Sequence, residues 1–160
     1  GIAKSVSLPG ARRWIPPFLS LTSAIENSRK DQTLNTPAVA TLVMLENQVR
    51  WLNENGGMAW STARCAQSAA LLYEWAERSE YARPFVAGPG SRSNAVVTVD
   101  LDDAVSAKQV IAALHENGIV DTSGYRKLGR NQLRIGVFPS VEPSDVAALT
   151  ACIDYVVEHL

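Results

Sequence analysis

A segment rich in glycine and proline, RPFVAGPGSRS at residues 83–93, divides this chain into two parts with different apolar patterns. Such residues interrupt both helices and strands, so we expect a loop and a boundary here. Before the loop, apolar residues repeat at spacings of three and four. This spacing predicts one helix from Pro37 to a stop at Gly56 and another from about Met58 to Arg78.

After the loop, strand-like and helix-like patterns alternate along the chain. β-Branched or alternating runs occupy residues 94–101, 119–120 and 132–138, and helical stripes cover residues 107–114 and 143–156. The order is β-α-β-β-α. It is typical of an α+β fold in which helices cover one side of a small antiparallel or mixed sheet.

Three parts are expected along the sequence. Residues 1–13 show neither apolar period and are expected to form an arm. Residues 14–82 would hold an extended segment, with strand character around residues 18–21, followed by the two long helices, the second of which has small residues that suggest close packing on a neighbour. Residues 83–160 would form the small α+β domain.

Composition narrows the classes of function. Of the 160 residues, 46% are hydrophobic and 19% are charged, which is typical of a globular domain. The formal net charge of −1 provides no overall field for nucleic acid or an anionic membrane, and no stretch reaches the ~20 apolar residues of a membrane-spanning helix. Cys65 and Cys152 stand far apart without neighbouring ligands, so we expect no metal site and a reducing, cytoplasmic setting.

The start of the first long helix is one candidate anion site. Asn35 and Thr36 precede Pro37, and proline fits the first position of a helix. A helix start presents backbone N–H groups without partners, and the two polar side chains add donors beside them. A phosphate would fit there. The alternative is an ordinary helix cap.

The segment YRKLGRNQLRIG at residues 125–136 is a second candidate. It gathers four cations with no acid between them: Arg126, Lys127, Arg130 and Arg134. Arg134 lies within an apolar strand, on the same face as Gly136 and Phe138. Its planar guanidinium there needs a carboxylate or phosphate partner. The partner could be a ligand or an acid elsewhere in the fold, or the side chain could simply face water.

Neither candidate contains a catalytic arrangement. The sequence shows no nucleophile paired with a base, no cluster of metal ligands and no glycine-rich phosphate loop. These residues therefore indicate anion binding without a group that performs chemistry.

Three blocks of the sequence resemble the C-terminal part of actinobacterial phosphoserine aminotransferase, from about residue 14 to the end. They are Trp14-Ile15-Pro16, NTPAVATLVMLENQVRWLNENGG at residues 35–57, and GIVDTSGYRKLGRNQLRIGVFPSVEPSDVAALTACIDYVVEHL at residues 118–160. The resemblance implies a fold-type I, class V aminotransferase that depends on pyridoxal phosphate and works as a cytoplasmic homodimer, with the two long helices at a domain interface. It implies transfer of the amino group of glutamate to 3-phosphohydroxypyruvate, giving phosphoserine and 2-oxoglutarate, in serine and pyridoxine biosynthesis.

The resemblance also implies roles for individual residues. Asn35 and Thr36 would reach the phosphate of the partner subunit's cofactor, and Arg134 would bind the α-carboxylate of the substrate. Tyr125 and Arg126 stand where other members carry a His-Arg pair near the substrate's phosphate or distal carboxylate. Lys127 and Arg130, in the same loop, receive no role.

Complete members of this family are more than twice as long as this chain. Their upstream part carries the lysine that binds the cofactor, the acid beside its pyridine nitrogen and the aromatic ring stacked on it. None of the chain's four lysines matches that lysine: Lys4, Lys30, Lys108 and Lys127. We therefore expect no catalytic residue, no covalently bound cofactor and no activity from this chain alone. A non-enzymatic module that binds small anions or mediates assembly is the alternative.

Overall fold

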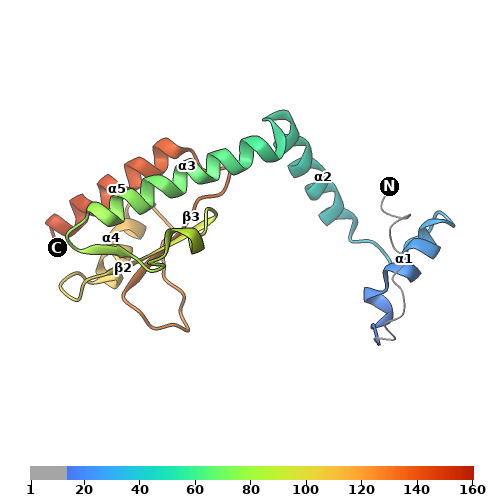
Figure 1. The fold of residues 1–160 in the computed structure, drawn as a ribbon, viewed down its shortest axis with the longest axis horizontal. Coiled ribbons are helices and arrows are strands. Elements are labelled where there is room, and N and C mark those ends of the chain that lie inside the picture. Colours follow the sequence, from blue (N-terminus) through green and yellow to red (C-terminus); the bar gives the residue numbers. More distant parts are fainter. Residues whose placement is uncertain (1–13) are drawn as a thin grey trace. The chain divides into compact units, whose positions relative to one another are not determined.

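The structure is a computed structural model that describes residues 14–160 (Figure 1). The arm expected at residues 1–13 lies outside the described residues. The chain divides into two compact units, one ending at Trp51 and the other running from Leu52 to Leu160. The expected boundary between residues 14–82 and the small domain at residues 83–160 is a domain boundary of the complete protein, and it stays a prediction.

The first unit begins with short helices where an extended segment was expected. A 3-10 helix, η2, spans Pro17–Leu19, and the helix α1 spans Leu21–Ser28. Ser20 caps α1, because its hydroxyl accepts a hydrogen bond from the Ser23 backbone N–H at 3.2 Å. The strand character predicted around residues 18–21 is wrong. Proline presets the backbone angle of a helix start and gives no N–H to a strand ladder, and the serine cap then starts the next helix.

The helix α2 spans Val39–Glu54 and begins two residues after Pro37, which the sequence placed at its first position. The Leu42 N–H donates to the Ala38 carbonyl at 3.0 Å, so Ala38 opens the helix. The apolar stripe of α2 includes Leu42, Leu45 and Val49, and all three are exposed. An amphipathic helix normally buries such a stripe, and the described part of the first unit does not cover this one.

The helix α3 spans Gly57–Arg78, in agreement with its prediction. The turn before it requires glycine, because Gly56 has a φ of 111° and a Cβ there would lie 2.9 Å from the Trp60 Cβ. Further along, one face of α3 belongs to the core of the second unit. The buried residues on this face are Ser68, Ala69, Leu72, Tyr73, Trp75 and Ala76.

Three antiparallel strands form the sheet in the order β1-β2-β3. They span Ala82–Pro84, Val96–Leu101 and Gln132–Gly136, respectively. A short 3-10 helix, η3, spans Pro89–Ser91 between the first two strands. β1 was not predicted, because it is three residues long and overlaps the segment expected to be a loop.

The strand predicted at residues 119–120 does not form. The Ile119 N–H donates to the Leu114 carbonyl at 2.9 Å, so it completes the end of the preceding helix instead of a strand ladder. The chain reaches the sheet a few residues later. There Ser123 forms an isolated bridge with Leu133, and the Arg134 N–H donates to the Thr122 carbonyl at 3.0 Å. This contact covers the outer edge of β3.

Helices pack on one face of the sheet, as Figure 1 shows. The helix α4 spans Ala107–Glu116, and α5 spans Pro143–Glu158 beside α3. Alternate residues of β2 are buried against them, as a sheet covered on one side requires. The predicted α+β fold is thus confirmed. Every helix in the described chain is too short or too polar to cross a lipid bilayer.

Candidate functional site

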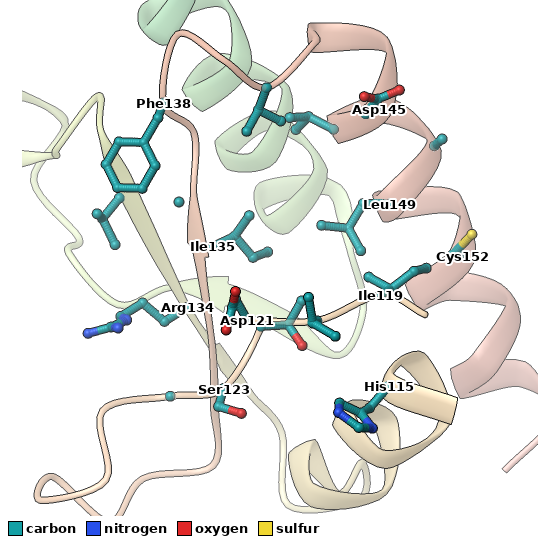
Figure 2. Close-up of a pocket in the computed structure, with 18 of the residues that line it drawn as sticks. His115, Ile119, Asp121, Ser123, Arg134, Ile135, Phe138, Asp145, Leu149 and Cys152 are labelled. Atoms are coloured by element: carbon teal, nitrogen blue, oxygen red, sulfur yellow. The ribbon is translucent and has the colours of Figure 1, made fainter. Parts of the chain in front are cut away.

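A cavity of about 1280 Å³ opens beside β3 (Figure 2). Its walls come from β3, the segment that precedes it, the connection that follows it, and the helices α4 and α5. Arg134, Arg126 and Tyr125 all line this cavity. The structure therefore brings together the three residues of the basic segment for which the resemblance implied contact with the substrate.

Arg134 is exposed on β3 while its neighbours Leu133 and Ile135 are buried. Its backbone is held on both sides, because it pairs with Thr98 of β2 and donates its N–H to the Thr122 carbonyl. Among residues 14–160, the ion pairs all involve other cations, and none reaches the Arg134 guanidinium. Its planar fork is thus available to a carboxylate or phosphate ligand.

Tyr125 and Arg126 lie on the loop that leads into β3, and both are exposed. The loop passes close to the strand at Gly124, where an added Cβ would lie 3.0 Å from the Gln132 carbonyl oxygen. A turn follows, closed by the Leu128 N–H donating to the Tyr125 carbonyl at 2.9 Å. This close approach and turn place Tyr125 and Arg126 at the cavity rather than in open solvent.

Arg130, by contrast, pairs with an acid of the same fold. Its guanidinium donates to the two carboxylate oxygens of Asp100 at 2.6 and 3.2 Å. Gln132 donates to the same carboxylate at 2.6 Å. Lys127 does not line the cavity either. For Arg130, the partner is thus an acid elsewhere in the fold, one of the alternatives that the sequence left open.

The Asp100 carboxylate should make stability depend on pH. Burial raises the pKa of Asp100, but hydrogen bonds from Arg130 and Gln132 outweigh it and hold this pKa below its ordinary value. A lowered folded-state pKa stabilises the fold above the unfolded pKa of about 4, and this contribution is lost as pH falls through the folded value. We expect Asp100→Asn to lower the urea midpoint at pH 7, with a gap to wild type that narrows below about pH 4.

Asp103→Asn is the matched control for this measurement. Asp103 lies three residues from Asp100, is exposed, and makes no ion pair in the described part of the chain. Its replacement should leave the urea midpoint near that of wild type at each pH. A constant gap for Asp100→Asn between pH 7 and pH 3 would show that the charge of this carboxyl does not contribute.

Asn35 ends a bend before α2, Thr36 follows it, and both are exposed. Because α2 begins at Val39, neither residue occupies the capping position, which Ala38 holds. The hydrogen bonds found within residues 14–160 include none from either side chain. The ordinary helix cap, the alternative kept for these residues, is therefore not what the structure shows, and their donors are available.

Most of the cavity lining was not indicated by the sequence. His115, Leu149 and Cys152 line it from two helices, and single residues at helical spacing look like ordinary core or surface positions. Only the alternation along β3 placed Gly136 and Phe138 on the face of Arg134. No group of three or more His, Cys, Asp or Glu in the described residues is placed to hold a metal ion.

The fold of this chain is that of aminotransferases. Phosphoserine aminotransferase from Bacillus circulans subsp. alkalophilus superposes with a TM-score of 0.78, at 23% identity, over 91% of this chain and 39% of that chain. Aspartate aminotransferase from Thermus thermophilus superposes with a TM-score of 0.65, at 22% identity, over 92% and 40% of the two chains. Both solved structures share the fold of this chain.

Two sequence relatives of this chain carry the same enzyme name. Phosphoserine aminotransferase of Rhodococcus opacus is 59% identical over 148 residues, which are 92% of this chain and 40% of that protein. A Mycolicibacterium vanbaalenii protein provisionally named phosphoserine aminotransferase is 57% identical over 159 residues, 99% of this chain and 43% of that protein. The chain is thus similar to part of phosphoserine aminotransferases, as its sequence blocks predicted. No family model matches it.

The chain spans about two fifths of the length of these relatives. The longer alignment also includes most of residues 1–13, where the sequence alone had shown no match.

Proposed function

We propose that the complete protein, of which this chain is a part, is a pyridoxal-phosphate-dependent phosphoserine aminotransferase. It would convert 3-phosphohydroxypyruvate and glutamate to phosphoserine and 2-oxoglutarate, as a cytoplasmic homodimer serving serine and pyridoxine biosynthesis. The observation that carries this proposal is 59% identity over 148 residues to a relative of that name. The same relatives do not favour a non-enzymatic module that binds anions or mediates assembly.

The cavity beside β3 supports the substrate class. Arg134 would bind the α-carboxylate through two parallel N–H···O bonds, which a free, exposed guanidinium on a rigid strand can make. Arg126 and Tyr125 would bind the phosphate or the distal carboxylate from the same cavity. Two cations lining one cavity suit substrates with an anionic group at each end.

Asn35 and Thr36 would hold the cofactor of the partner subunit. The Asn35 amide and the Thr36 hydroxyl are exposed and have no hydrogen-bond partner within residues 14–160, which fits donors to phosphate oxygens. Pyridoxal phosphate, when bound, supplies the group that carries the amino group between the two substrates. This chain contributes hydrogen bonds that orient that group.

Under this proposal, the lysines of the described chain do not hold the cofactor. Lys30, Lys108 and Lys127 are exposed, and none lines the cavity. Lys4 lies outside the described residues. The residues of this chain would therefore bind and orient anions, while the lysine that bonds to the cofactor and moves protons comes from elsewhere in the complete protein.

Comparing the complete protein with this 160-residue chain tests the assignment. The complete protein, loaded with pyridoxal phosphate, should form glutamate from phosphoserine and 2-oxoglutarate. The 160-residue chain alone should give no turnover above the rate of free cofactor, and no visible absorbance band of a lysine-bound cofactor, because it lacks the required lysine. Coupled glutamate detection and absorbance spectra measure the two outcomes.

Serine without its phosphate is the control substrate. The complete protein should use it far less well, because the second cation of the cavity then has no anionic partner. Equal rates with serine and phosphoserine would overturn the substrate assignment. Turnover by the 160-residue chain would overturn the division of roles between this chain and the rest of the protein.

A further inference from the structure

An exposed phenylalanine, Phe138, lines the same cavity as Arg134. Arg134, Gly136 and Phe138 occupy alternate positions at the end of β3, and all three line the cavity. Figure 2 labels Arg134 and Phe138 in its wall. Phe138 is 53% exposed. A large apolar side chain gains stability by leaving water, so this ring on the cavity wall would gain stability by contacting the apolar part of a bound ligand.

Gly136 makes room for the Phe138 ring. A Cβ at residue 136 would lie 2.7 Å from Cε2 and 3.3 Å from Cδ2 of that ring, so the ring rests directly on the glycine backbone. The φ of Gly136 is not in the left-handed region, and its backbone could accept another residue. Glycine is therefore required here by the position of the ring.

Arg64 of α3 holds the connection that follows Phe138. Its Nε donates to the Pro139 carbonyl at 2.7 Å, and its guanidinium forms an ion pair with Glu142. Between these two contacts, the Val141 N–H donates to the Phe138 carbonyl at 2.9 Å and closes a turn. The Arg64 side chain is only 17% exposed. The turn is thus tied at two points to a core helix, which limits where Phe138 can move.

We propose that Phe138, resting on Gly136 and anchored through Arg64, is the apolar wall of the Arg134 anion site and contacts the carbon chain of the substrate. The proposal rests on the function proposed above for Arg134. Substrates of that reaction have two anionic groups joined by a short carbon chain. While Arg134 binds one end, the ring covers the chain and excludes water, which strengthens the charged hydrogen bonds.

In this arrangement Phe138 is a substrate-contacting residue, and Arg64 is a positioning residue that acts through it. The fold offers a matched control for Arg64. Arg92 is 13% exposed, pairs with Glu77 at 2.6 Å and donates its Nε to the Val86 carbonyl at 3.0 Å. It holds the connection over residues 85–93, none of which lines the cavity.

Steady-state kinetics of the complete enzyme with phosphoserine and 2-oxoglutarate test the proposal. Phe138→Ala, Gly136→Ala and Arg64→Met should each raise KM about 5- to 20-fold, with a smaller change in kcat, because the wall is lost or displaced. Gly136→Ala should add nothing in a Phe138→Ala enzyme, where no ring remains to be displaced. Arg92→Met should lower the Tm about as much as Arg64→Met but leave KM unchanged.

The outcomes distinguish the proposed role of Phe138 from the substrate-binding role proposed for Arg134. If Arg134→Lys leaves KM unchanged, the proposed role of the whole site fails. If Arg134→Lys raises KM and the Phe138 and Gly136 variants do not, only the apolar wall is excluded. Equal KM changes for Arg64→Met and Arg92→Met, or additive changes for Gly136→Ala and Phe138→Ala, would overturn the anchoring described here.

Discussion

Replacing Arg134 by alanine in the complete enzyme should lower kcat/KM for phosphoserine about 100- to 1000-fold, mainly through KM. The guanidinium has no acid to pair with in the described chain, so its bonding capacity is left for a ligand. Removing one partner of a charged, hydrogen-bonded pair typically costs about 2–5 kcal/mol. Arg134→Lys should recover only part of the loss, because an ammonium keeps the charge but not the planar fork.

Arg130→Ala is the control for this prediction. Arg130 comes from the same basic segment and sits four residues away, but it is paired with Asp100 at 2.6 Å. Its removal should lower the urea midpoint and leave KM near the wild-type value. The test compares KM for phosphoserine between Arg134→Ala and Arg130→Ala, measured by steady-state kinetics under the same conditions. A larger rise in KM for Arg130→Ala than for Arg134→Ala would contradict the assignment.

The local sequence pattern correctly predicted helices that end at a glycine of their own segment. The stop after α2 was expected at Gly56, which has a φ of 111°, and Gly118 after α4 likewise has a φ of 80°. Each stop needs the left-handed conformation, which glycine adopts without strain. The helical stripes between such stops then follow from spacing alone.

Elements that depend on a distant partner were missed or misplaced. β1 contains Pro84 and is three residues long, yet it forms because β2 offers it an edge, with Pro84 opposite Val99. Residues Ile119 and Val120 have strand-forming side chains, but the N–H of Ile119 is taken by the end of α4. In both cases the hydrogen-bond partner, which a local pattern does not contain, decides the outcome.

The candidate site shows the same division. The sequence grouped four cations and distinguished Arg134 because it lies in an apolar strand. It could not tell that Arg130 would meet an acid 30 positions away, since that pairing exists only once β2 and β3 are aligned. Ion pairing in the fold thus decides which cations of the segment remain available to a ligand.

Replacing Asn131 by alanine should destabilise the second unit by about 2–4 kcal/mol, at roughly 1 kcal/mol for each hydrogen bond lost. Its side-chain NH2 group shares its two hydrogens among the carbonyls of Leu101, Asp102 and Val105, at 3.1, 3.1 and 2.8 Å. The side-chain oxygen of Asn131, Oδ1, accepts a hydrogen bond from the Ala107 N–H at 2.8 Å. One side chain therefore holds the whole connection between β2 and α4. Urea unfolding should show a lower midpoint with an unchanged slope.

Asn117→Ala is the matched control, because Asn117 makes one exposed hydrogen bond, from its side-chain amide to the Ala113 carbonyl at 2.9 Å. Its loss should cost less than about 1 kcal/mol. Similar losses for the two variants would show that the Asn131 network does not hold the connection. Asn131 precedes Arg134 by three residues and does not line the cavity. Well below the Tm, Asn131→Ala should therefore leave KM unchanged, which separates loss of the fold from loss of the site.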